Sequence, residues 1–139
     1  KRRANFKEWT GIFNKYSKYF ILPLATENSD PSWFAFIVTL KDAIPFTRDE
    51  LTGFLNTKLI ETRNLFAGNM TKQPGFIKKN WRIADNLKNT DLIMNNTFFL
   101  GTYPGLTEDM FSYAEGVLEE FLCKYSFKLF ALLGVDETI

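Results

Sequence analysis

The chain has 139 residues, a net charge of +1, no histidine, one cysteine and 17% aromatic residues. Without histidine it lacks the commonest general base and metal ligand, and a single cysteine excludes both a disulfide and a thiolate zinc site within the chain. The small net charge gives no overall field for nucleic acid, and no apolar run reaches the roughly 20 residues of a membrane span. We therefore predict a cytoplasmic protein with an aromatic core and neither nucleic-acid nor membrane partners.

An aromatic stripe predicts a helix at the start of the chain. Phe6, Trp9, Phe13, Tyr16 and Phe20 recur at alternating steps of three and four residues, which is the spacing of one face of an amphipathic helix. No capping signal precedes the stripe. It therefore fits either the end of a longer helix or a plain N-terminal helix.

Two strand candidates come next. Residues 21–24 form a short one, which Pro23 restricts to an edge or to a strand end. A turn cluster at 28–32 separates it from residues 33–40, which read Trp-Phe-Ala-Phe-Ile-Val-Thr-Leu and are almost wholly apolar. We expect this second strand to be central or covered on both faces.

A second helix has a clear start signal. Thr47 and Glu50 have the spacing of a capping box, and Phe46 and Leu51 hold the positions of a hydrophobic staple around it. The predicted core face of this helix comprises Leu51, Phe54, Leu55 and Leu59. A further strand is predicted at 59–63.

The polar segment 61–76 follows, and its breakers Gly68, Pro74 and Gly75 exclude a regular helix or core strand. Polar groups on a loop between apolar elements are typical of a binding site, but also of a solvated surface loop. Arg63 suits a phosphate or carboxylate, and its alternative is a weak ion pair with Glu61.

Lys72 is a second candidate anion contact, with the same alternative of a surface ion pair. Phe66 would stack on a sugar or base, or fill the core. No glycine-rich phosphate loop of the usual spacing occurs.

The last third of the chain predicts a short helical turn at 91–96, a strand at 97–102, and a helix capped by Thr107 with acids in its first turn. Cys123 is expected to pack on the apolar face of that helix. This buried face comprises Met110, Ala114, Val117, Leu118, Phe121, Leu122 and Tyr125. Together the elements predict the α/β class, as an α+β two-layer sandwich with helices on a sheet of three or four strands.

Four blocks of sequence carry a family resemblance: 30–36 (DPSWFAF), 62–74 (TRNLFAGNMTKQP), 89–99 (NTDLIMNNTFF) and 101–107 (GTYPGLT). They resemble the C-terminal part of RfbH-type lipopolysaccharide biosynthesis enzymes, which are similar to CDP-4-keto-6-deoxy-D-glucose 3-dehydratase. These enzymes belong to the DegT/DnrJ/EryC1/StrS aminotransferase superfamily. The resemblance implies that residues 1–125 are the small C-terminal domain of a type I pyridoxal-phosphate fold. The tail 126–139 is left with no assigned packing.

The resemblance also implies an activity that the fragment alone would lack. The missing N-terminal domain would hold pyridoxal or pyridoxamine phosphate, a histidine in place of the Schiff-base lysine and, in one branch, an iron–sulfur cluster. The parent would be a homodimer, with a reductase partner in that branch. It would remove the C3 hydroxyl of a nucleotide-linked 4-keto-6-deoxy sugar, for the dideoxysugars of the O-antigen.

One position bears on the branch. Related sugar aminotransferases tend to carry a histidine two or three residues before the Gln-Pro pair, where this chain has Thr71. Its absence favours the 3-dehydratase over an aminotransferase, and a non-catalytic binding module is the third alternative.

By the same resemblance, the loop 63–73 would close one side of the active-site cleft. The implied substrate- or cofactor-binding residues are Arg63, Phe66, Asn69 and Lys72, with Asn95 and Asn96 in support. We also expect an exposed apolar patch near Phe66, Met70 and the aromatic stripe, where the large domain would lie.

Overall fold

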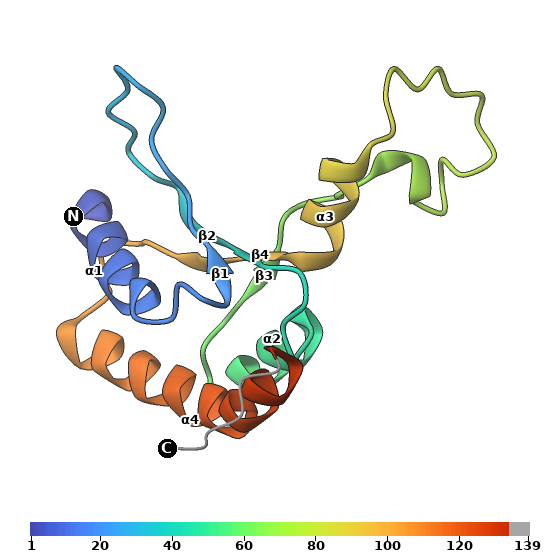
Figure 1. Ribbon diagram of the computed structural model, residues 1–139. Coiled ribbons are helices and arrows are strands. Elements are labelled where there is room, and N and C mark those ends of the chain that lie inside the picture. The colour runs from blue at the N-terminus through green and yellow to red at the C-terminus, as the bar shows by residue number, and fades with distance from the viewer. Residues whose placement is uncertain (134–139) are drawn as a thin grey trace.

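The computed structural model of the chain describes residues 1–133, with side chains through Ser126. The elements are α1 (Arg2–Asn14), β1 (Phe20–Ile21), β2 (Ala35–Leu40), α2 (Arg48–Thr57), β3 (Arg63–Asn64), the 3-10 turn η1 (Met70–Lys72), α3 (Lys88–Asn96), β4 (Thr97–Gly101) and α4 (Glu108–Leu133). The strands form one antiparallel sheet in the order β1-β2-β4-β3. Helices α1, α2 and α4 lie on one side of it (Figure 1). The predicted two-layer sandwich with a four-stranded sheet is thus confirmed.

Strand β2 is central, as predicted, but helices of this chain cover only one of its faces. Phe36, Val38 and Leu40 are buried on the helix side, whereas Ile37 and Thr39 on the other side are half-buried. The short β1 takes the predicted edge position, but it ends at Ile21, so only the first residue of the strand predicted at 21–24 belongs to it. The hydroxyl groups of Thr39 and Thr97 lie 2.8 Å apart across β2 and β4.

The first helix ends earlier than the aromatic stripe predicted. It stops at Asn14, and the backbone N–H groups of residues 15–17 and 19 then bond to carbonyls three residues back. Phe20 pairs with Leu40 in the sheet and is buried there. The spacing predicted one continuous helix because a strand residue that points into the core satisfies the same pattern as a helical one.

The stripe is also buried, apart from the half-buried Tyr16, which corrects the expectation that it would be exposed. Phe6 stacks on Trp33 with ring centroids 4.2 Å apart, and Trp9 meets Phe111 edge-to-face at 4.9 Å. Phe13 is buried as well. Helix α1 is therefore closed against β2 and α4 by rings of its own chain.

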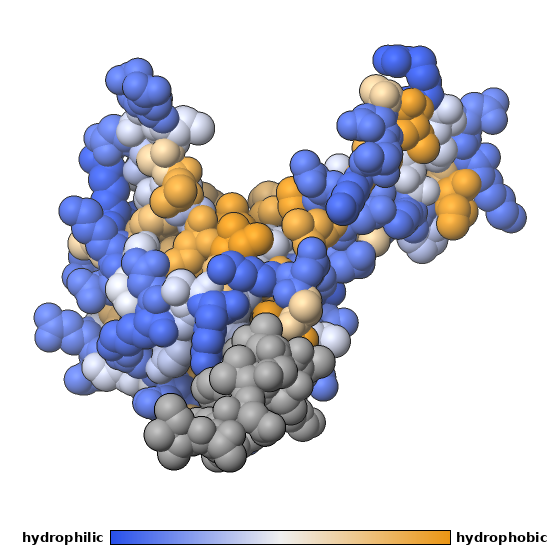
Figure 2. Space-filling model, in the orientation of Figure 1, coloured by the Kyte–Doolittle hydropathy of each residue, from blue (hydrophilic) through white to orange (hydrophobic). Residues whose placement is uncertain are grey.

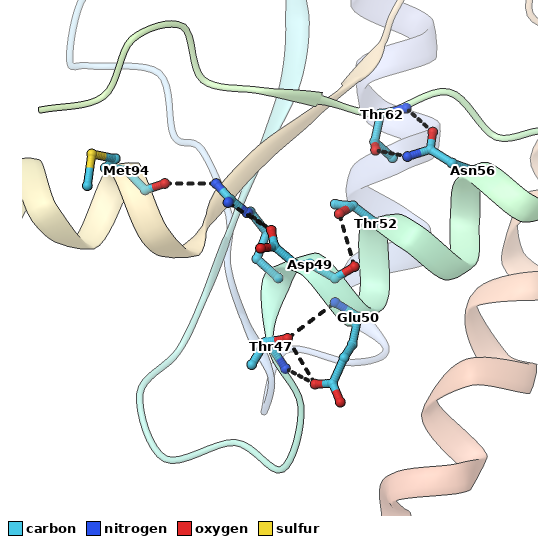
Figure 3. A network of polar contacts seen from close by, with 8 residues as sticks. Thr47, Asp49, Glu50, Thr52, Asn56, Thr62 and Met94 are labelled. Atoms are coloured by element: carbon cyan, nitrogen blue, oxygen red, sulfur yellow. Dashed lines mark hydrogen bonds and ion pairs between the residues drawn. The ribbon is translucent and has the colours of Figure 1, made fainter. Parts of the chain in front are cut away.

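The start of α2 agrees with the sequence, and its end does not. The Glu50 N–H donates to Thr47 Oγ1 at 3.2 Å, and the Thr47 N–H donates to Glu50 Oε2 at 2.7 Å (Figure 3). Phe46 and Leu51 are both buried, as expected for the staple. Leu59, predicted in the core, is 94% exposed, because the helix ends before it and the chain turns there with a φ of 60°.

Helix α4 begins at the predicted cap, where Thr107 Oγ1 accepts the Met110 N–H at 3.3 Å. Its buried face is rotated slightly from the prediction, so Phe111 is buried while Met110 and Cys123 are exposed. The other predicted positions are buried, or half-buried in the case of Tyr125. The helical backbone continues through the predicted boundary at 125 as far as Leu133, and residues 134–139 of the predicted tail lie outside the described residues.

The remaining strands and helix are displaced by a few residues. The strand expected at 59–63 is reduced to the two residues of β3, since the positive φ of Leu59 prevents an extended backbone there. Helix α3 starts at Lys88, three residues before the predicted turn at 91–96.

Candidate functional site

Among the described residues, no helix covers the second face of the sheet, and the polar segment 61–76 borders this face. Figure 2 shows apolar side chains gathered over this face, between the segment joining β1 to β2 and the segment leading to α3. Three rings meet there, because Phe99 of β4 lies 6.1 Å from Phe34 and 6.2 Å from Phe66 between ring centroids. We call Phe34, Phe66 and Phe99 the open-face cluster.

Phe66 is the most unusual member of this cluster. It is 80% exposed, and its backbone has a φ of 48°. A non-glycine residue rarely adopts this left-handed conformation, and strain of this kind is typical of functional loops. The predicted exposed apolar patch near Phe66 and Met70 is therefore present, without the aromatic stripe.

Arg63 lies on the same side of the sheet, because it pairs with Phe99 across β3 and β4. Its Nε and Nη2 atoms donate to one oxygen of Glu61, at 2.9 and 2.8 Å. Both side chains are exposed, so this ion pair is weak and can be exchanged for a ligand anion. The structure thus contains the ion pair that was the alternative reading of Arg63, and leaves its planar fork accessible.

Asn69 organises the loop from within. It is only 2% exposed, and its Oδ1 accepts the N–H of Thr71 at 3.0 Å and the hydroxyl of Thr71 at 2.7 Å. Its Nδ2 donates to Asp91 Oδ1 at 2.7 Å. Both the oxygen and the nitrogen of this amide are thus bonded to residues of the loop and of α3.

Lys72 is fixed by the same carboxylate. Its Nζ lies 2.9 Å from Asp91 Oδ2, while about half of its side chain stays exposed. The hydrogen bonds from Lys72 and then from Asn69 lower the pKa of the Asp91 carboxyl, outweighing a small opposing effect of desolvation. Asp91 also lies in the first turn of α3, where the helix dipole favours a negative charge.

Asn95 and Asn96 are the last two residues of α3. Asn96 Nδ2 donates to the carbonyl of Leu40 at 3.3 Å, which ties α3 to β2. Asn95 and Asn96 line a cavity of about 400 Å³ with the residues that connect β2 to α2. Arg48 joins this region as well, donating through Nη1 to the carbonyl of Met94 at 2.7 Å (Figure 3).

A second cavity, of about 410 Å³, was not expected from the sequence. It lies between α1, α4 and the β3 edge of the sheet, and Arg63 and Phe99 reach it from the candidate site. The buried Trp9 also lines it. The exposed Tyr103 and Tyr113 complete the wall.

No group of three His, Cys, Asp or Glu residues is placed to hold a metal ion among the residues whose side chains are described. Within residues 1–133, no helix is long and apolar enough to cross a membrane.

Comparison with known proteins places this chain in a family. The sequence profile described as the DegT/DnrJ/EryC1/StrS aminotransferase family matches residues 1–118. The lipopolysaccharide biosynthesis protein RfbH of Salmonella typhimurium is 46% identical over 120 residues, which is 86% of this chain and 28% of the relative. The dTDP-4-dehydro-2,6-dideoxy-D-glucose 3-dehydratase of Saccharopolyspora spinosa is 45% identical over 106 residues, which is 76% of this chain and 23% of the relative.

A solved structure shows the same fold. The E. coli GDP-4-keto-6-deoxy-D-mannose-3-dehydratase with bound hydrated PLP superposes with a TM-score of 0.73 and 26% identity, over 84% of this chain and 30% of that protein. The match confirms the predicted fold as the small domain of a pyridoxal-phosphate enzyme. The chain spans less than a third of the length of these relatives.

Proposed function

This chain belongs to the DegT/DnrJ/EryC1/StrS aminotransferase family, and from that premise we propose that it is the C-terminal domain of a nucleotide-sugar 3-dehydratase. The parent would use pyridoxamine phosphate and act in the dideoxysugar branch of lipopolysaccharide O-antigen biosynthesis. The observation that carries the proposal is the identity of 45–46% to RfbH and to a named 3-dehydratase across most of the chain. Alone, the chain would be inactive.

The loop 63–73 and the open-face cluster would form one wall of the active-site cleft. Arg63 and Lys72 are exposed cations on the same loop, which suits the phosphates of a nucleotide sugar or of the cofactor. Phe66 would supply an apolar wall for the sugar or base. Asn69, as a buried residue, would shape the loop rather than touch the ligand, and Asn95 and Asn96 would hold α3 beneath it.

The cofactor would be bound largely by parts of the parent outside this chain. Pyridoxamine phosphate, when bound, would supply the amine and the electron sink for removal of the C3 hydroxyl. The exposed Arg63 and Lys72 fit its phosphate chemically. The parent would be a cytoplasmic homodimer, and in one branch of the family it would also carry an iron–sulfur cluster and use a reductase partner.

A nucleotide-sugar aminotransferase is the second candidate, and one observation weighs against it. Thr71 stands near the place where related aminotransferases tend to have histidine, and its hydroxyl is engaged by Asn69 at 2.7 Å. The position is thus used to build the loop instead of offering an imidazole. A non-catalytic binding module is the third candidate.

The test is to read and assay the full-length protein that carries this chain. A histidine at the cofactor position, with release of the C3 hydroxyl from a GDP-, dTDP- or CDP-linked 4-keto-6-deoxy sugar, supports the dehydratase. A lysine there with amino transfer supports the aminotransferase, and the absence of an upstream domain leaves the binding module.

A pair of variants then tests the loop. Arg63→Ala should lower kcat/KM at least about tenfold if its guanidinium binds the ligand anion. Arg82→Ala removes an exposed arginine of the neighbouring segment and serves as the control. Equal effects of the two would remove Arg63 from the proposed site.

A further inference from the structure

One carboxylate closes the base of the longest irregular segment in the described part of the chain. The segment between η1 and α3 comprises residues 73–87, and its apolar side chains at 76, 77, 81 and 83 are exposed. Asp91 Oδ1 accepts from Asn69, and Asp91 Oδ2 pairs with Lys72. The carboxylate therefore joins the two stems of this segment, one oxygen to each partner.

The carboxylate itself is held in place by the body of the domain. Helix α3, which carries it, is bound to α2 through Arg48 and Met94 and to β2 through Asn96. Gly68 approaches the same helix so closely that a Cβ there would lie 3.1 Å from Met94 Cα. The loop thus follows the position of α3.

We propose that Asp91 is a positioning residue of the candidate active site, which fixes the loop by holding Asn69 and Lys72 at once. The inference rests on the proposed function. Lys72 has three N–H donors and uses one on Asp91, so its exposed ammonium can meet a ligand anion without leaving the carboxylate. Prior fixation lowers the entropy that the loop loses when the ligand binds.

The neighbouring Asp85 provides a matched control. Its carboxylate accepts the Asn86 N–H at 2.6 Å and belongs to the same exposed segment, but it contacts neither Asn69 nor Lys72. Asp85→Asn and Asp91→Asn therefore remove the same charge from the same region. Asp91→Asn keeps an oxygen that can accept from Asn69, and Asp91→Ala removes both contacts.

The first measurement is solvent exchange of the Asn69 side-chain amide by NMR, on the 139-residue chain. We expect at least about tenfold faster exchange in Asp91→Ala and no change in Asp85→Asn. Unchanged exchange in Asp91→Ala would overturn the inference, whatever the parent enzyme does.

The second measurement is steady-state kinetics of the full-length enzyme with the nucleotide-linked sugar it turns over. We expect Asp91→Asn to raise KM about three- to tenfold while kcat changes less than about twofold. In a Lys72→Met background, Asp91→Asn should add less than about twofold, because the two residues act together. Loss of stability alone would lower the active fraction and leave KM unchanged, which would contradict the inference.

The two measurements separate this inference from the proposed function. If the unaltered full-length protein turns over no nucleotide sugar, the proposed function fails, and amide exchange alone decides whether Asp91 fixes the loop. If the enzyme is active but the KM of Asp91→Asn equals that of Asp85→Asn, the proposed function stands and the positioning role is wrong.

Discussion

The two faces of the sheet are built from the same strands but differ in burial. On the helix side, Phe36 of β2 is fully buried and lies within 5.1–6.4 Å of the rings of Phe6, Trp9 and Phe13. On the other side, Phe34 and Phe66 flank Phe99 and are 70% and 80% exposed. Helices of this chain close the helix-covered face, whereas the residues that the structure describes leave the rings of the open face largely exposed.

The comparison separates stability from function within one sheet. Burial of large rings contributes the main favourable term of folding, so the helix side should carry most of the stability. Exposed apolar groups contribute little to the isolated fold, and a cluster of them typically marks a contact surface. A substitution on one face should therefore affect mainly folding, and on the other mainly binding.

The largest expected effect comes from a matched pair of phenylalanines. Phe36→Ala should lower the free energy of unfolding by about 3–5 kcal/mol, because it leaves a cavity in a packed core. Phe34→Ala, on the open face two residues earlier, should change it by less than about 0.5–1 kcal/mol. Urea titration of both variants checks the difference. Similar losses would show that the open face also stabilises the fold.

A glycine of the loop 63–73 gives the next largest expected effect on stability. Gly68 has a φ of 61°, and an added Cβ would lie 2.7 Å from Met94 Cβ. Gly68→Ala should therefore cost about 1–3 kcal/mol, through both the left-handed backbone and the collision. Gly75→Ala is the control, since nothing lies within 4 Å of its added Cβ. Hydrogen exchange of the loop amides would reveal whether the loss stays local.

Sequence reasoning succeeded where local signals and core packing agree. The capping box at Thr47, the central strand and the family of the chain were all predicted, because each depends on short-range patterns. The end of α1 was wrong, since an aromatic period of three and four residues continues through a turn into β1. The prediction that Leu59 lies in the core was wrong, because a helix can end on a residue other than glycine in the left-handed conformation.

The loop of the candidate site was predicted in position and only partly in detail, and its role in binding stays a prediction. Polar composition and breakers located the loop, yet they could not show that Asn69 would be buried or that Arg63 would share a side of the sheet with Phe99. The partner of Lys72 and Asn69 lies 19 residues beyond Lys72, at Asp91, and nothing in the local sequence links them. Such pairs arise from the fold, which brings the two stems together.

Leu59 provides a prediction of the opposite sign. It follows α2 at the position where glycine usually ends a helix, and the N–H of Ile60 bonds to the carbonyl of Leu55 at 3.0 Å, as in a Schellman motif. Because Leu59 is almost fully exposed, Leu59→Gly should relieve strain and raise the free energy of unfolding by up to about 1 kcal/mol. Thermal unfolding measures it, and Leu59→Ala, which keeps the strain, is the control. A lower melting temperature would mean that Leu59 packs against this domain after all.

The smallest expected effect is a loss of stability of the loop 63–73 in acid. Since the folded pKa of Asp91 is lowered, its contacts with Lys72 and Asn69 stabilise the loop above the ordinary pKa of the carboxyl, and this contribution is lost as the pH falls through the folded value. The groups are close to solvent, so added salt should weaken the effect. Comparing unfolding of the unaltered chain and Asp91→Asn should give a difference at pH 6 that disappears below the folded pKa of Asp91. A difference that persisted in strong acid would show that the shape of Asp91 matters and not its charge. The pH dependence of the helix-covered face should be the same in both chains.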